Sequence, residues 1–207
     1  MSRIPYAPSE IEFVERKSRF IGNIFCVSSE AEARAAIRDV ETLHDRANHV
    51  VYAYDIAAEN ASRFFDAGEP KGTAGLPVYE IFRRENLTNY CCTVTRYFGG
   101  ILLGAGGLIR AYANTARLAL EAAGIAEETP YIAFSLTCDY PHYDIIRAHL
   151  RGVEHTAGNA DFGERITLGM TVPQEIYEEL LHDLAEITAG MSNAGDVRVV
   201  MKPRRIK

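Results

Sequence analysis

The chain has 207 residues, of which 47% are hydrophobic and 24% charged, and a formal net charge of -6. These values exclude a disordered chain and suffice for one or two hydrophobic cores. The acidic balance excludes tight nonspecific binding to duplex nucleic acid, because that affinity comes mainly from neutralisation of phosphates by Lys and Arg. No leader pattern and no apolar run of bilayer-spanning length is present, so we expect a soluble cytoplasmic protein without a membrane partner.

Alternating and β-branched residues predict the strands of the first half of the chain. Two strands are expected within residues 11–27, one at His49–Ile56 and one at Tyr90–Tyr97. Ser29 and Glu32 have the spacing of a capping box and predict the start of a helix. The expected inner face of this helix consists of Ala33, Ala36, Ile37, Val40 and Leu43.

Two more helices are predicted before residue 124. Helical spacing of apolar residues indicates one at Leu76–Arg84 and a longer one at Gly106–Ala123. On the longer helix, residues three and four positions apart share a face and separate a packed side from a polar stripe. The expected packed side consists of Ile109, Ala113, Ala116 and Leu120, and the expected stripe of Arg110, Asn114, Arg117 and Glu121.

The segment Gly124–Pro130 is predicted to be a linker, because Pro130 disfavours continuation of the preceding helix. We therefore expect two α+β domains, residues 1–128 and 129–207. The elements expected after the linker are a strand at Ile132–Cys138, a helix at Pro141–Arg151, a hairpin turn near Asp161–Glu164, a helix at Ile176–Ile187 and a strand at Val197–Met201. Their order, βαββαβ, is the ferredoxin-like pattern.

The cysteines and histidines do not have the spacing of a metal site. The four cysteines lie in predicted strands without a Cys-x-x-Cys pair, which indicates buried reduced thiols and not disulfides or zinc ligands. They are Cys26, Cys91, Cys92 and Cys138. His49 lies in a strand and is interpreted as a packing histidine.

Two glycine clusters, DAGEPKGTAG at 66–75 and TRYFGGILLGAGGLIRAY at 95–112, are the most informative segments. Glycine occurs where the backbone takes positive φ or approaches another group closely, so both segments are expected to have defined loops. In the first cluster, Asp66, Glu69 and Thr73 are neighbouring polar groups. Their carboxylates are candidates for cation binding or acid–base work, and loop capping is the alternative.

The second cluster lies between a predicted strand and a predicted helix, within residues 86–120, which contain no Asp or Glu. Arg96, Arg110 and Arg117 make this window basic. Free amides at a helix N-terminus beside arginines predict an anion or phosphate site. The alternative is that the glycines allow close helix packing and the arginines are solvated. Neither the P-loop spacing nor the dinucleotide-binding spacing is present.

Together, DxGEPxGTAG and TRYFGGxLLGxGGLxRAY resemble the signature of the IMPACT family in its bacterial YigZ-type form. Lys17-Ser18-Arg19-Phe20 and the strand that starts at His49 are similar to further family features. The resemblance covers essentially the whole chain, most strongly residues 17–120. It implies a first domain similar to domain two of ribosomal protein S-five and a ferredoxin-like second domain, the pair of folds that ends elongation factor G.

The resemblance implies a role in translation and not a particular reaction. Eukaryotic members regulate the translational stress response by competing, through protein contacts, for the activator of an initiation-factor kinase. The folds of bacterial members imply binding to nucleic acid or the ribosome. This chain departs from the family pattern at Ala67, where an acidic residue is usual, at Lys71, where a small residue is usual, and at Val51, where cysteine is frequent. The first change weakens a metal site, and Lys71 favours an anionic partner.

We therefore expect a non-enzymatic, translation-related protein that contacts RNA, the ribosome or a translation-associated protein through a glycine–arginine face. The expected binding residues are Asp66, Gly68, Glu69, Lys71, Gly72, Thr73, Arg96, Gly99, Gly100, Gly104, Gly106, Gly107, Arg110 and Tyr112. No catalytic residue, metal or cofactor is assigned. Two alternatives stay open: an enzyme for a phosphorylated ligand, because Leu103–Leu108 loosely resembles the phosphate loop of GHMP kinases, and a protein-interaction adaptor.

Overall fold

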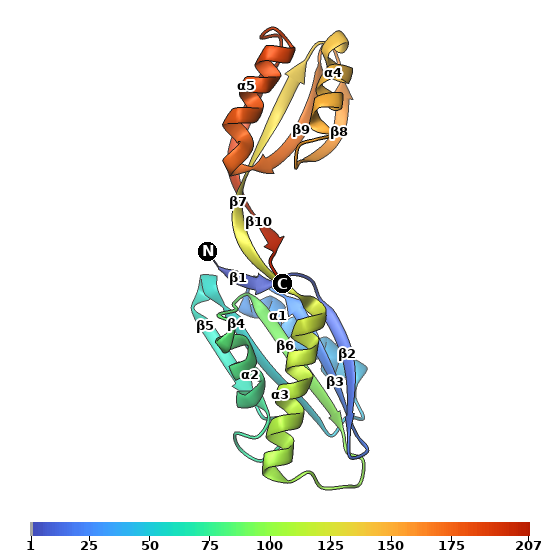
Figure 1. The fold of residues 1–207 in the computed structure, drawn as a ribbon. Coiled ribbons are helices and arrows are strands. Elements are labelled where there is room, and N and C mark those ends of the chain that lie inside the picture. Colours follow the sequence, from blue (N-terminus) through green and yellow to red (C-terminus); the bar gives the residue numbers. More distant parts are fainter. Residues whose placement is uncertain (1) are drawn as a thin grey trace. The chain divides into compact units, whose positions relative to one another are not determined.

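The computed structural model describes residues 2–207 and separates them into two compact α+β units (Figure 1). The first unit contains the residues up to 128 together with 203–207, and the second contains residues 129–202. Among the described helices, none combines the length and the apolar character needed to cross a bilayer.

The first unit is built on an antiparallel sheet with the strand order β2-β3-β6-β4-β5. Its strands are β2 (Ser9–Glu15), β3 (Ser18–Cys26), β4 (His49–Ile56), β5 (Ala61–Phe65) and β6 (Tyr90–Tyr97). Its helices are α1 (Glu30–Leu43), α2 (Gly75–Arg84) and α3 (Gly104–Ala123), with a short 3-10 turn at Ala57–Glu59. Helices α2 and α3 pack on one face of the sheet and α1 on the other (Figure 1).

The alternation of side chains along the central strands explains these two layers. On β6, Cys92 and Val94 enter the core under α2 and α3, whereas Cys91 enters the core under α1. On β4, Val51 and Tyr54 separate in the same way. Because successive residues of a strand point to opposite faces, one buried strand supplies side chains to both cores.

The start of α1 is as predicted. The Ser29 side chain accepts a hydrogen bond from the Glu32 amide, as the capping box predicts. The Glu32 carboxylate accepts from the amide of Ser28, one residue before the N-cap, in place of the Ser29 amide. Ala33, Ile37 and Val40 are buried. The expectation for Leu43 is wrong, because its side chain in the last turn is 72% exposed.

The packed face of α3 also differs from the expectation. Ile109 is 42% exposed, and Ala113 is only half-buried. The buried residues are Leu108, Ala111, Tyr112, Thr115, Ala116, Ala119, Leu120 and Ala123. Small apolar residues occur on most sides of this helix, so the periodicity did not distinguish the packed face, and contact with β2 and β3 selects it.

The second unit has the ferredoxin-like order β7-α4-β8-β9-α5-β10 with the sheet order β10-β7-β9-β8. Its elements are β7 (Ile125–Cys138), α4 (Tyr140–Leu150), β8 (Thr156–Phe162), β9 (Ile166–Pro173), a 3-10 turn at Gln174–Ile176, α5 (Tyr177–Ile187) and β10 (Asn193–Arg205). Alternate residues of β7 and β9 and the inner faces of both helices form one core, so both helices cover the same face of the sheet. The predicted βαββαβ order is confirmed.

The segment 124–130 contains the boundary between the two units, after residue 128, but it is a strand and not a loop, because β7 already begins at Ile125. A strand that the sequence analysis did not identify, β1 (Arg3–Pro5), pairs with residues 125–127, and the Ile125 amide bonds to the Lys207 carbonyl. These partners lie far away along the chain, so no local pattern signals them. The edge strand β5 was missed as well.

Three of the four thiols are buried as expected, but Cys26 is exposed. All four are free cysteines. Burial raises the pKa of the Cys91 thiol to about 12, so this group stays protonated and unreactive at neutral pH.

The exposure of Leu43 predicts unequal effects of two truncations on the same helix. Ile37→Ala is expected to lower the free energy of unfolding by about 2–4 kcal/mol, because it leaves a cavity in the core. Leu43→Ala is expected to change it by less than about 0.5 kcal/mol. Urea denaturation followed by circular dichroism measures both, and equal losses would contradict the packing of α1.

Candidate functional site

The two glycine motifs meet at one end of the first unit. The loop 66–74 leads from β5 into α2, and the loop 98–103 leads from β6 into α3. Both loops and the β2–β3 turn lie at the same end of this unit (Figure 1). The fold therefore brings together residues that are far apart in sequence, such as Ser18 and Gly99, which are 81 positions apart.

A row of three side chains across the sheet forms the base of the site. Arg96 on β6 is paired with Phe20 on β3 and with His49 on β4. Phe20 belongs to the core under α2 and α3, and cross-strand partners share a face, so all three side chains point toward these helices. The Arg96 guanidinium carbon lies 5.6 Å from the centre of the Phe20 ring.

A buried ion pair lies above this row. Arg96 Nη1 is 2.6 Å from Glu69 Oε1, and the Tyr112 hydroxyl donates to the same oxygen at 2.8 Å. The side chains of Arg96 and Glu69 are only 7% and 4% exposed. Desolvation, reinforced by the Glu69 charge, raises the pKa of Tyr112, so its hydroxyl keeps its proton and remains a donor.

Arg96 therefore does not lie on an exposed face, contrary to the expectation from the sequence. Its Nη1 group donates to Glu69, and Nη2 lies 3.4 Å from the Ser18 hydroxyl. Phe98 covers the guanidinium at 5.5 Å. Its charge is compensated inside the unit, and Ser18, which lies outside both glycine motifs, contributes to this environment.

Asp66 shapes the first glycine loop. Its carboxylate accepts hydrogen bonds from the amides of Gly72, Ala74 and Gly75 at 2.8, 3.2 and 2.8 Å. The Thr73 hydroxyl donates to the Pro70 carbonyl within the same loop. Since Asp66 organises the loop and Glu69 is ion-paired, the capping alternative accounts for this motif. The described chain contains no group of three or more His, Cys, Asp or Glu side chains positioned to hold a metal.

The glycines of the second motif have different roles. A Cβ atom at Gly99 would lie 2.0 Å from the Lys17 carbonyl, so only glycine lets the chain pass the β2–β3 turn there. Gly100 and Gly104 have φ of 83° and 70°, in the left-handed region. Gly106 is exposed in the first turn of α3, and a Cβ atom there would meet only the end of Arg110 at 3.6 Å.

His49 is part of this site, although the sequence indicated only a packing role. Its Nδ1 lies 2.8 Å from the Ala67 carbonyl, and its Nε2 lies 3.8 Å from Glu69 Oε1. Because a carbonyl only accepts, Nδ1 carries the proton. Its register opposite Arg96 is the feature that brings it here, and the signal in the sequence was the similarity of the strand that starts at His49 to a family feature.

A pocket of about 440 Å³ opens beside Glu69. We call it the Glu69 pocket. Its lining consists of Asn48, His49, Glu69, Pro70, Arg96, Phe98, Leu102, Leu103, Gly104, Ala105 and Leu108. It therefore brings together the start of β4, both glycine loops and the first turns of α3.

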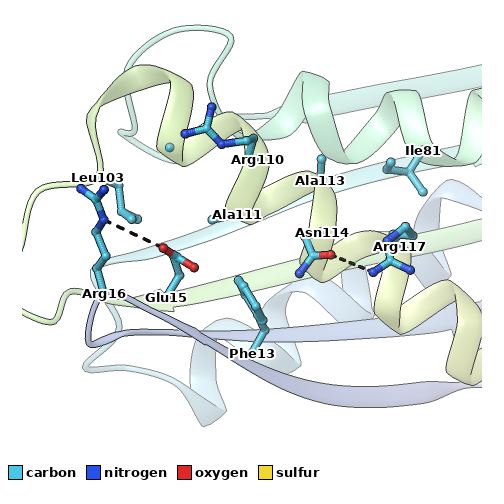
Figure 2. A pocket seen from close by; sticks show the side chains of 11 residues that line it. Phe13, Glu15, Arg16, Ile81, Leu103, Arg110, Ala111, Ala113, Asn114 and Arg117 are labelled. Atoms are coloured by element: carbon cyan, nitrogen blue, oxygen red, sulfur yellow. Dashed lines mark hydrogen bonds and ion pairs between the residues drawn. The ribbon is translucent and has the colours of Figure 1, made fainter.

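A second hollow of about 530 Å³ lies between β2 and α3 (Figure 2). Its apolar part includes Phe13, Ile81 and Leu103. Figure 2 shows the guanidinium groups of Arg16, Arg110 and Arg117 distributed around it. We call it the arginine groove. Of the expected binding residues, only Gly107 and Arg110 line it.

The charges in the arginine groove are unevenly compensated. Arg117 donates to Asn114 and pairs with Glu121, and Arg16 lies 4.0 Å from Glu15 (Figure 2). Arg110 forms no ion pair with any described residue. Lys71, which is exposed on the first glycine loop, likewise has no ion-pair partner among residues 2–207.

Comparisons with known proteins place this site in a defined family. Residues 16–120 match the Impact N-terminal domain, and residues 136–191 match a domain of unknown function, DUF1949. The chain belongs to the IMPACT family. The resemblance inferred from the two glycine motifs is thus confirmed, and both motifs lie inside the matched Impact N-terminal domain.

Several relatives extend the similarity over most of the chain. The identity to IMPACT family member YvyE of Bacillus subtilis (strain 168) is 35% over 185 residues, covering 89% of this chain and 85% of YvyE. IMPACT family member YigZ of Escherichia coli (strain K12) is 32% identical over 190 residues, covering 90% and 93%. A crystal structure of a hypothetical protein has a TM-score of 0.59 at 30% identity, covering 95% of this chain and 97% of that one.

The buried ion pair predicts strong coupling between its two residues. Glu69→Leu and Arg96→Met are each expected to lower the free energy of unfolding by about 3–5 kcal/mol, because each leaves an uncompensated buried charge. The double variant removes both charges and is expected to cost less than the sum. Urea unfolding of the four proteins measures this coupling, and additive losses would show that the pair is not a unit.

Alanine substitutions at two glycines distinguish a glycine that close backbone packing requires from one that has open space around it. Gly99→Ala is expected to destabilise the protein by at least about 2 kcal/mol, because the added methyl group overlaps backbone atoms of the β2–β3 turn. Gly106→Ala is expected to stabilise it by up to about 1 kcal/mol, because alanine is the better helix former. The midpoint of thermal unfolding reports both changes; a stabilising Gly99→Ala would refute the observed approach.

Proposed function

We propose that this IMPACT family protein is a non-enzymatic, translation-related binding protein that contacts ribosomal RNA through the arginine groove. The observation that carries the proposal is the placement of three guanidinium groups around one partly apolar hollow (Figure 2). Guanidinium groups bind phosphate oxygens in a bidentate manner, and an apolar floor accommodates an unstacked base.

The distribution of charge supports a local contact. Arg110 is unpaired, and the exposed Lys17 and Lys71 form no ion pair within the described residues. A chain with a net charge of -6 repels phosphate overall, so attraction has to come from such a patch. Arg96 takes no part in this contact, because it is buried against Glu69.

The two alternative functions, a protein-interaction adaptor and an enzyme for a phosphorylated ligand, are not equally supported by the structural features of this site. A protein-interaction adaptor is favoured by the exposed apolar side chains of Phe98, Ile101 and Leu102 on the second glycine loop. An enzyme for a phosphorylated ligand has less support, because its proposed acid–base residues are both engaged: Asp66 binds loop amides and Glu69 binds Arg96.

Co-sedimentation with bacterial ribosomes across a salt series tests the RNA contact. Wild-type protein is expected to associate at low salt and to weaken about tenfold or more between 50 and 200 mM salt, as release of counterions requires. Arg16→Glu/Arg110→Glu is expected to abolish association. The matched control Arg38→Glu/Arg46→Glu makes the same charge change at exposed arginines outside the groove and is expected to weaken it only slightly.

Free protein at every salt concentration would refute the proposal. So would equal losses in the two double variants, because the effect would then come from net charge alone. Binding that does not depend on salt but is lost on Leu102→Asp would support the adaptor instead.

A further inference from the structure

Glu69 has one carboxylate oxygen without a partner. Oε1 accepts from Arg96 and Tyr112, whereas Oε2 accepts no hydrogen bond from any residue that the structure describes. Only 4% of the side chain is exposed, and Glu69 lines the Glu69 pocket. This oxygen is not among the fully buried unpartnered atoms of the described chain, so the small exposed part of the side chain leaves it open to a donor from solvent or from a ligand in the pocket.

His49 provides a second hydrogen-bond acceptor in the lining of the Glu69 pocket. Its Nδ1 donates to the Ala67 carbonyl, which in the neutral ring leaves Nε2 with a lone pair. Nε2 lies 3.8 Å from Glu69 Oε1, beyond hydrogen-bonding distance, and no other described residue bonds to it. An ammonium group placed between His49 and Glu69 would donate to both acceptors, and two neighbouring hydroxyl groups would donate to one each.

The first turn of α3 forms another part of the pocket wall, at Gly104 and Ala105. No side chain caps this helix, and its first turn contains no acidic residue. Its amides and the positive end of the helix dipole therefore favour an anionic group. Phe98, Leu102 and Leu108 supply apolar surface in the same pocket.

We propose that the Glu69 pocket binds a small metabolite that carries one anionic group and either an ammonium group or neighbouring hydroxyl groups. The anion would lie at the N-terminus of α3, and the ammonium or hydroxyl groups would donate to Glu69 Oε2 and His49 Nε2. The volume of about 440 Å³ lies within the usual range for small-molecule sites. Sugar phosphates and amino acids share this chemistry. The site is separate from RNA binding in the arginine groove and does not depend on it.

Ligand-observed NMR on the full-length protein tests this site with defined probes at millimolar concentration. The probes are ribose 5-phosphate and glycerol 3-phosphate for the phosphate class, L-leucine for the amino-acid class, and ribose and leucinamide as analogues without the anion. At least one anionic probe is expected to bind, and its analogue to bind about tenfold or more weakly, because the analogue leaves the helix terminus unpaired. Which probe binds identifies the class.

Three variants test whether the anionic probe binds in the Glu69 pocket. Ala105→Glu adds a negative charge to the pocket at a position where the helix dipole favours it, so the fold is retained and anion binding is expected to fall about tenfold. His49→Ala removes the second acceptor and is expected to weaken the same probe about fivefold or more. Gly106→Glu adds the same charge in the same turn but outside the pocket lining and beside Arg110, which can pair with it, so it is expected to weaken binding clearly less than Ala105→Glu.

Glu69→Gln is not used, because it would also break the buried ion pair. The proposal is overturned if no anionic probe binds, or if Ala105→Glu and His49→Ala bind as tightly as the wild type. Ribosome association of Ala105→Glu and His49→Ala is expected to stay intact, so failure here is distinguishable from failure of the RNA proposal.

Discussion

The ion pair between Glu69 and Arg96 joins a loop, the sheet and a helix of the first unit, and the arrangement of the candidate site depends on it. It ties the loop 66–74 to the central strand β6, and Tyr112 joins α3 to the same carboxylate oxygen. A buried pair of this kind is tolerated only when its geometry and hydrogen bonds compensate for desolvation. The row Phe20, Arg96 and His49 supplies that geometry, because the strand registers leave no freedom in their placement.

This interaction divides the charged residues of the two glycine motifs into two kinds. Arg96, Glu69 and Asp66 are engaged in holding the loops, whereas Arg110 and Lys71 remain available at the surface. The two glycine motifs consequently form two neighbouring features and not one face: the Glu69 pocket and the arginine groove, which meet at Leu103. An RNA contact and a small-molecule site are therefore compatible proposals on one unit.

Much of the fold could be predicted, because local residue patterns determine these strands and helices. The strands β4 and β6 begin and end at the predicted residues, and the capping box marks the start of α1. What could not be predicted depends on distant partners. Strand β1 and the first residues of β7 exist because they pair with each other, and the packed face of α3 is chosen by the sheet beneath it.

By itself, the sequence determined the family, the α+β class of both units and the residues that carry the two motifs, because these follow from residue identity and spacing. Only the tertiary structure decided which charges are buried and which are free. Burial and ion pairing depend on what lies opposite in the sheet and above it. Glu69 and Arg96 are 27 positions apart, and no local pattern signals their contact. The same reason placed His49 and Ser18 in the site, where strand register and close approach at Gly99 put them.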